Sequence, residues 1–313
     1  MKNVLVVHYS QSGQLSDVVS AMLRPLEEAG VRVHQEVLRP QTPFPFPWPF
    51  FRFLDAFPES VRLDPRPNLP LTVAPDTDFD LVILAWQVWY LSPSQPVTAF
   101  LQSDEGKRLL AGKPVVSVVA CRNMWMTAYD KLVTLLGAAG AHLTDHVAFT
   151  DNAHPLATFI TTPRWMFTGR RDRFFGLPAA GVTPAEAAAA ARFGHALVTA
   201  LARDEERSGA PMLTGLRAVS VNPRLVVSER AGQRAFRVWS GFVRLFGKPG
   251  QLRRVPALAL FVTYLIVLII TVVPLSLVLQ RSFAPLLRNR LDALRARYEQ
   301  PSGSGNARMT EHD

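Results

Sequence analysis

Short valine-rich runs alternate with amphipathic stretches through the first 207 residues, and this alternation limits the fold more than any other feature of the sequence. Short apolar runs between polar turns are typical of buried strands, whereas apolar residues spaced three and four apart indicate helices. Strands are expected at 3–8, 31–38, 79–85, 114–120 and 142–150, and helices at 15–29, 94–111, 125–139 and 183–207. This order predicts an α/β domain with a five-stranded, doubly wound parallel sheet.

Two stretches interrupt the alternation, at about 40–75 and 152–182. The first holds ten prolines, which exclude the interior of a regular helix or sheet. It also holds aromatic residues too apolar for a solvated linker, namely Phe44, Phe46, Trp48, Phe50, Phe51 and Phe53. We therefore expect an ordered insertion that packs over a ligand pocket, a partner or a lipid bilayer. The second insertion carries further aromatic residues and the basic pair Arg170 and Arg171.

Residues 255–279 form a run of 25 residues without a charge. At about 1.5 Å per residue, a helix of this length can cross a hydrocarbon core of about 30 Å. Pro274 also permits a segment that enters the bilayer and returns on the same side. Five basic residues lie near each end of the run, so the positive-inside rule does not choose between the two arrangements.

The flanks of this run differ from the α/β domain in charge. Residues 208–254 hold nine Arg or Lys against one Glu and are expected to be a basic juxtamembrane linker. Residues 280–313 are expected to be a basic amphipathic tail, with an interfacial helix over 282–298 and disorder from Pro301.

The net charge of +9 is concentrated in these flanks, which indicates a collar around a membrane anchor and not a nucleic-acid footprint. The single cysteine, Cys121, excludes an intrachain disulfide and a multi-cysteine metal site, and no metal is expected. The apolar run at residues 4–7 is too short for a secretory signal. The α/β domain is therefore expected in the cytoplasm.

Three predicted loops leave the edge of the sheet where open parallel sheets bind ligands. The first offers hydroxyls, a glycine and a helix N-terminus that suit a phosphate: Ser10, Gln11, Ser12, Gly13, Gln14 and Leu15. The second offers rings that suit a flat aromatic ligand: Trp86, Gln87, Val88, Trp89 and Tyr90. The third contains Cys121, Arg122, Asn123, Met124 and Trp125. Neither GxGxxG nor GxxxxGK[ST] is present, which argues against NAD in a Rossmann half and against ATP.

Together the three loops resemble those of flavodoxin. In that family a loop of the form [ST]-x-[ST]-x-x-[ST] holds the phosphate of FMN, and the two later loops enclose its ring. Ser10 and Ser12 match this pattern, whereas Leu15 replaces the last hydroxyl. The resemblance covers about residues 1–207 without the two insertions. It implies a flavodoxin-like fold, FMN as the cofactor and the residues of these three loops as its contacts.

Six segments spread over nearly the whole chain carry a narrower resemblance: HYSQSGQL, PFPFPWPFF, DLVILAWQVWYLSPS, CRNMW, WMFTG and YEQPSG. They are similar to bacterial proteins known as dialkylresorcinol condensing enzymes, which accompany dialkylresorcinol and aryl-polyene biosynthesis. A condensing enzyme of the ketosynthase type needs a nucleophilic cysteine with basic partners on a larger fold, and this chain has one cysteine at the expected flavin edge. The resemblance therefore implies the following step, a flavin-dependent oxidation of a cyclic dione to a resorcinol.

This interpretation assigns candidate roles and partners. His154 and Arg122 are candidates for proton transfer and enolate stabilisation. The resemblance implies an alkyl-substituted, amphiphilic cyclic substrate and attachment to the bacterial inner membrane with the catalytic domain in the cytoplasm. A ketosynthase, an acyl carrier protein and a second copy of the chain are candidate partners. Two alternatives stay open: an NAD(P)H:quinone reductase of flavodoxin type, and a non-enzymatic scaffold that has lost FMN and recruits a ketosynthase.

Overall fold

Five parallel strands form the central sheet of the computed structural model, which describes the backbone of residues 1–282 and 284–311, and their side chains except at 155, 272–287 and 311. The strands are β1 (Asn3–His8), β2 (Arg32–Val37), β3 (Leu81–Trp86), β6 (Pro114–Cys121) and β7 (His142–Thr150). Their spatial order, β2-β1-β3-β6-β7, is the 2-1-3-4-5 order of flavodoxin-like sheets, which confirms the predicted fold class. Two short antiparallel strands, β4 (Val88–Trp89) and β5 (Ser92–Pro93), follow β3.

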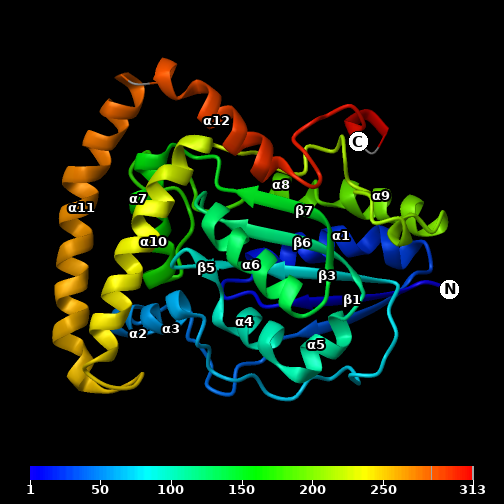
Figure 1. Ribbon diagram of the computed structural model, residues 1–313, viewed down its shortest axis with the longest axis horizontal. Coiled ribbons are helices and arrows are strands. Elements are labelled where there is room, and N and C mark those ends of the chain that lie inside the picture. The colour runs from blue at the N-terminus through cyan, green and yellow to red at the C-terminus, as the bar shows by residue number, and fades with distance from the viewer. Residues whose placement is uncertain (283, 312–313) are drawn as a thin grey trace.

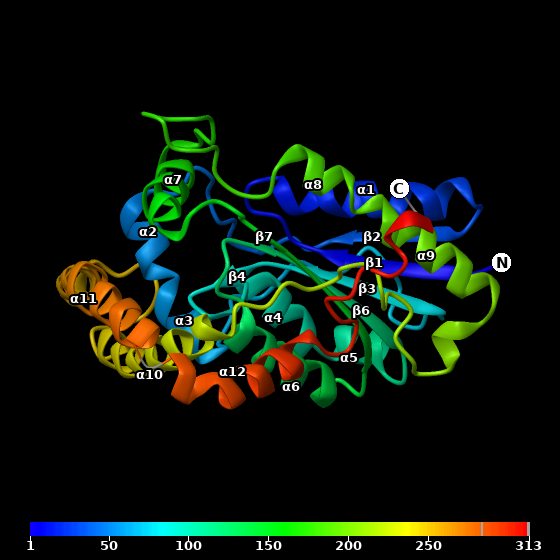
Figure 2. The same ribbon diagram turned by 90° about the horizontal axis from the view of Figure 1, so that it is seen from above.

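Helices cover both faces of this sheet, as Figure 2 shows. One face carries α1 (Gln14–Glu28), α8 (Pro184–Ala188) and α9 (Ala191–Ala202), and the other carries α4 (Gln95–Gln102), α5 (Asp104–Leu110) and α6 (Met126–Ala138). The single helix predicted over 94–111 is divided at Ser103, whose extended backbone ends α4 and whose hydroxyl caps α5. Thr183 and Glu186 form a capping box at the start of α8. Single turns of 3-10 helix occur at Glu205–Arg207, Leu252–Arg254 and Met309–Glu311.

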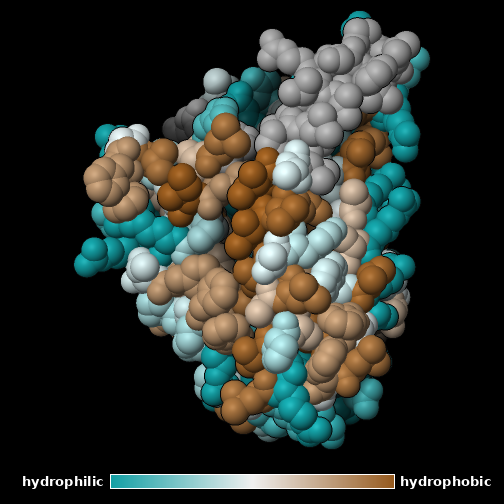
Figure 3. All heavy atoms as spheres, turned by 90° about the vertical axis from the view of Figure 1, so that its left-hand side faces the viewer, coloured by the Kyte–Doolittle hydropathy of each residue, from teal (hydrophilic) through white to brown (hydrophobic). Residues whose placement is uncertain are grey.

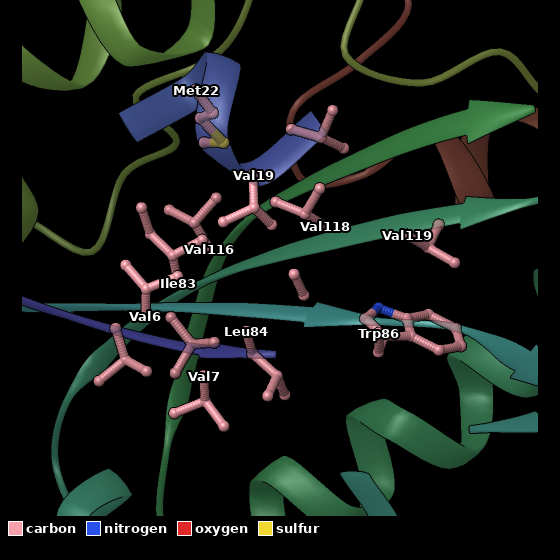
Figure 4. Close-up of a cluster of buried hydrophobic side chains, with 14 of the residues drawn as sticks. Val6, Val7, Val19, Met22, Ile83, Leu84, Trp86, Val116, Val118 and Val119 are labelled. Atoms are coloured by element: carbon pink, nitrogen blue, oxygen red, sulfur yellow. The ribbon is translucent and has the colours of Figure 1, made fainter. Parts of the chain in front are cut away.

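The core on either side of the sheet is dominated by branched aliphatic side chains. Val6, Ile83 and Val116 are register neighbours on three adjacent strands, and each is fully buried. Val19 and Met22 of α1 belong to the same buried cluster (Figure 4). A parallel sheet covered on both faces has no wet side, which explains why its central strands are continuous apolar runs.

Five helices gather beyond the carboxyl ends of the strands, on the left of Figure 1, and together they are called the cap. They are α2 (Phe50–Asp55) and α3 (Phe57–Arg62) from the first insertion, α7 (Pro155–Thr168) from the second, and α10 (Pro223–Arg244) and α11 (Val255–Ser282) from the C-terminal part. Phe57 and Phe261 stack with their ring centroids 4.0 Å apart. The first insertion is therefore ordered, and it packs against helices of the same chain.

The C-terminal part is more structured than the sequence indicated. Residues 208–254 are not a linker throughout, because α10 occupies 22 of them and buries Val226 and Glu229. After α12 (Ala284–Glu299), the segment predicted to be disordered from Pro301 is ordered through 311. The buried Ser302 hydroxyl donates to Asp145 Oδ1 at 2.7 Å and accepts from the backbone N–H of His146 at 2.9 Å. The tail is thus docked beside β7.

Within the described residues, one helical stretch, Leu252–Thr271, is long and apolar enough to cross a membrane, with a mean hydropathy of 2.2. Length and composition alone are weak evidence for a membrane span, because the core helix of a soluble protein passes the same test. In this stretch only 22% of the residues are buried inside the molecule.

Candidate cofactor site

The strand order creates a topological switch point between β1 and β3, because β2 lies on one side of β1 and β3 on the other. Open α/β sheets bind ligands outside the carboxyl ends of their strands at such a point. The loops that follow β1, β3 and β6 leave the sheet at this edge, on the side of the cap (Figure 1). The predicted site residues therefore lie at the expected edge.

Residues 10–13 turn the chain from β1 into α1 and leave an open helix N-terminus. Gly13 precedes α1 with a φ of 85°, a left-handed conformation that favours glycine. No side chain among the described residues caps this helix, and a Cβ on Gly13 would meet nothing within 4 Å. The Ser10 hydroxyl is buried and has no hydrogen-bond partner within the described part of the chain. Free backbone space at a helix N-terminus beside an orphaned hydroxyl suits a phosphate.

The other side chains of this loop are held by the chain itself. Gln11 Nε2 donates to two carbonyl oxygens of the first insertion, at 3.0 and 2.7 Å. Gln14 Oε1 accepts from the backbone N–H of Val182 in the second insertion at 2.8 Å. Leu15 is fully buried in the core, so only its backbone is left for a ligand, and Ser12 is half-buried. The loop therefore joins both insertions to the edge of the sheet.

Two of the aromatic residues predicted to face a flat ligand lie in the core. Trp86 and Trp125 are 0% and 1% exposed. Trp86 Nε1 donates to Ser117 Oγ at 2.8 Å, and the ring of Trp125 packs 5.0 Å from that of His146. Protein covers these two indoles, so the structure does not present them as stacking surfaces.

The other two aromatic residues of the β3 loop contact the first insertion. Trp89 lies with its ring centroid 4.9 Å from that of Phe44 and 5.4 Å from that of Trp48. Tyr90 has a φ of 51°, and its hydroxyl donates to the carbonyl oxygen of Phe53 at 2.7 Å. Burial raises the pKa of Tyr90 well above its ordinary value. The proline-rich insertion thus covers this loop with aromatic rings.

The remaining predicted contacts are half-buried residues of the β3 and β6 loops: Gln87, Val88, Cys121, Asn123 and Met124. Gln87 Oε1 accepts from the backbone N–H of Gln11 at 3.2 Å, which joins the loops after β1 and β3. Burial raises the pKa of the Cys121 thiol well above its ordinary value. A neutral thiol is a poor nucleophile.

Helix α7 contributes polar side chains that the sequence interpretation missed. Arg122 Nε donates to Thr158 Oγ1 at 2.6 Å, and its guanidinium carbon lies 4.0 Å from the ring centroid of Phe159. Burial lowers the pKa of Arg122 to about 10, while the charge of Asp151 opposes that shift. Thr161 Oγ1 is buried and unpartnered within the described residues. The available signal was the three-residue spacing of Thr158 and Thr161, which places both hydroxyls on one side of a helix.

His154 has a different environment from Arg122. It is the N-cap residue of α7, where its Nδ1 accepts from the backbone N–H of Leu156 at 3.3 Å, and its side chain is exposed. Among the described residues, no group of His, Cys, Asp or Glu side chains could hold a metal ion. Of the two candidate catalytic residues, Arg122 is therefore a half-buried cation and His154 is a solvent-facing imidazole.

Comparison with known proteins found no matching family model and no matching curated protein. Among solved structures, a flavoprotein from Lactobacillus acidophilus in complex with FMN is 14% identical, with a TM-score of 0.39 over 47% of this chain and 93% of that protein. A putative flavoprotein from Bacteroides uniformis is also 14% identical, with a TM-score of 0.36 over 53% of this chain and 97% of that one. The flavodiiron protein from Giardia intestinalis is 16% identical, with a TM-score of 0.38 over 67% of this chain and 38% of that one. The fold assignment here depends on the strand order and not on these values.

Proposed function

We propose that this chain is a membrane-anchored oxidoreductase that uses FMN. The observation that carries the proposal is the buried hydroxyl of Ser10, which has no partner among the described residues and lies beside the open N-terminus of α1 at the switch point of the sheet. These groups fit a phosphate, because backbone N–H groups and a hydroxyl at a helix N-terminus favour an anion. Ser10, Ser12 and the backbone from Gly13 to Leu15 would hold the phosphate of FMN.

The proposed reaction converts an alkyl-substituted cyclic dione into an aromatic resorcinol, within dialkylresorcinol or aryl-polyene biosynthesis. FMN supplies the two-electron acceptor that this dehydrogenation requires. The half-buried guanidinium of Arg122 would stabilise the enolate oxygen of the dione, and His154 would exchange a proton with solvent. The six resembling segments support this substrate class, and the aromatic cap supplies apolar surface for alkyl chains.

The proposed location is the inner membrane of a bacterium, with the α/β domain in the cytoplasm. The apolar stretch Leu252–Thr271 and the basic residues on either side of it support membrane attachment. A lipid-like product would enter the bilayer directly. A ketosynthase and its acyl carrier protein are the proposed suppliers of the substrate.

The decisive experiment is the absorbance spectrum of the full chain purified in detergent, recorded before and after addition of NAD(P)H. We expect a bound flavin that denaturation releases as FMN, and loss of its colour when the cyclic dione is added without oxygen. A folded preparation that stays colourless after incubation with FMN contradicts the proposal. Rapid bleaching by NAD(P)H followed by reoxidation with a quinone identifies a quinone reductase instead.

A second candidate, the non-enzymatic scaffold, is favoured by one specific observation. Trp86 and Trp125 are covered by protein, and the rings of the first insertion lie on Trp89. In a scaffold these rings would replace the flavin permanently. The scaffold function predicts that a ketosynthase co-purifies with this chain and that the purified chain contains no flavin.

A further inference from the structure

We propose that α11 lies along one leaflet of an anionic bilayer and does not cross it, so that both of its flanks stay on the side of the α/β domain. This inference rests on the membrane attachment in the proposed function, but it is independent of FMN. Three observations support it: the contacts at the two ends of α11, the exposed apolar side of this helix, and the basic residues around that side.

A buried cation holds the N-terminal end of α11 against the cap helices α2 and α3. Arg254, the residue before α11, is 0% exposed. Its Nη1 lies 3.0 Å from Asp55 Oδ1, and its Nη2 lies 3.1 Å from Glu59 Oε2. The buried residues Leu258 and Phe261 then continue the contact along one side of the helix. The start of α11 is therefore fixed against the first insertion.

The chain beyond α11 returns to the same domain. Helix α12 packs against α10, and the hydroxyl of Tyr298 at its end donates to Asp130 Oδ2 of α6 at 2.7 Å. The tail then pairs with the segment after α9, where the backbone N–H of Arg217 donates to the carbonyl oxygen of Gly305 at 2.7 Å. A helix that crossed the bilayer would carry these residues to the opposite side. Because they contact the α/β domain, a crossing is incompatible with this fold.

The side of α11 that faces away from the other cap helices is apolar and exposed. Leu260, Ile266, Val267 and Ile270 are between 51% and 68% exposed, and their spacing of six, one and three residues places them on one side of the helix. Figure 3 faces this side of the molecule and shows hydrophobic residues gathered across it. An exposed apolar face along a helix whose other face is packed is the arrangement of a helix that lies in a membrane interface.

The charge around this face selects anionic lipid as the occupant. Arg237, Arg244, Lys248 and Arg253 are exposed on α10 and on the loop that leads to α11. Arg224, Arg288 and Arg295 line a groove of about 450 Å³ between α10 and α12, where Asp292 is the one acidic residue among the described lining residues. Two copies of the chain facing each other here would bring like charges together. Anionic headgroups supply the opposite charge, and the acyl chains cover the apolar residues.

Topology labelling tests the proposal in cells. Single cysteines are introduced at two exposed serines in a Cys121→Ser background, Ser304→Cys in the tail and Ser208→Cys directly after the α/β domain. A membrane-impermeant maleimide is then applied to spheroplasts and to inverted vesicles. We expect both cysteines to react only in inverted vesicles. Reaction of the tail cysteine only in spheroplasts would show a crossing helix and overturn the proposal.

Vesicle flotation of the purified full chain tests the surface itself. We expect binding to vesicles that contain phosphatidylglycerol, weaker binding in high salt, and little binding to pure phosphatidylcholine. Ile270→Asp should lower the partition coefficient roughly tenfold or more. Val133→Asp, at an exposed valine of α6, is the matched control and should leave it unchanged.

Equal partitioning of the two variants, or a stable dimer that does not bind vesicles, would overturn the proposal. A chain absent from both membranes and vesicles would overturn this proposal together with the proposed membrane attachment. The flavin spectrum would still test the oxidoreductase separately, so the two failures are distinguishable.

Discussion

The α/β domain and the cap lie side by side, but they are held together by different chemistry. Around the sheet, aliphatic residues such as Val6 and Ile83 pack in one continuous core. In the cap, aromatic rings pack in several smaller clusters, and Arg254 forms ion pairs with two carboxylates. Aliphatic burial is non-directional and follows from local sequence, whereas ring pairs and buried charges require particular partners. The stability of the cap should therefore depend on a few identifiable residues.

Breaking the buried ion pairs should have the largest effect on the cap. Arg254→Ala leaves Asp55 and Glu59 buried without their nearest cation, and burial already raises the pKa of Glu59. We expect the free energy of unfolding to fall by about 3–5 kcal/mol, measured by denaturant titration in detergent. Arg253→Ala, at the exposed neighbouring arginine, should change it by less than about 0.5 kcal/mol. Similar losses for both variants would show that Arg254 does not anchor the cap.

The contact between α10 of the cap and α6 of the α/β domain should make the stability of the chain depend on pH. Glu229 of α10 is buried and accepts the backbone N–H and hydroxyl of Thr127 at the start of α6, at 2.7 and 3.0 Å. Burial raises its pKa from 4.5 to about 7. The folded chain therefore binds an extra proton between these two pH values, and stability should fall as pH rises through this window.

We expect this group to remove about 3 kcal/mol from the free energy of unfolding between pH 4.5 and 7. Unfolding of the parent chain and of Glu229→Gln at a series of pH values measures the difference. Glu205→Gln, at an exposed position, should retain the parental pH dependence. If Glu229→Gln also retained it, another group would be responsible for the titration.

The candidate cofactor site lies where the α/β domain meets the cap. A substitution there should weaken FMN binding without lowering the stability of the flavin-free chain. Ser10→Ala removes a buried hydroxyl that has no partner within the described residues, so the flavin-free chain should be as stable as the parent or slightly more stable. The same change should cost FMN binding about 1.5–3 kcal/mol, or roughly tenfold to a hundredfold in Kd. Flavin fluorescence quenching and thermal unfolding measure the two effects. Ser20→Ala, at an exposed position on α1, is the control and should change neither.

The sequence predicted the α/β domain better than the cap because its signals are local. Each strand is a short apolar run, and the capping box at Thr183 lies within four residues. The order of α10 and of the tail depends on distant partners. Ser302 packs against Asp145, 157 residues earlier, and Arg254 pairs with Glu59, 195 residues away. Charge composition alone made these segments resemble a solvated linker and a disordered tail.

The site shows the same limit. The polar residues and Gly13 after the first strand predicted a turn that leads into a helix, and the structure has this turn before α1. Composition could not show which face of an aromatic residue is covered. Trp86 looks like a ligand contact in the sequence, but its indole N–H is bonded to Ser117 on the neighbouring strand. The polar residues Thr158 and Thr161 went unnoticed because they occur in an insertion outside the family pattern.

The smallest expected effect concerns the ring pair that joins the first insertion to α11. The rings of Phe57 and Phe261 are nearly parallel, at 15°, with their centroids 4.0 Å apart. Phe57→Leu and Phe261→Leu should each destabilise the cap, and the double variant should lose less than the sum of the two. We expect a coupling energy of about 0.5–1.5 kcal/mol from a double-mutant cycle in detergent. Val6→Ala combined with Phe57→Leu, one change in each region, should be additive within about 0.5 kcal/mol. Coupling in that second pair as large as in the first would mean that the contact between the two rings is not the source of the first coupling.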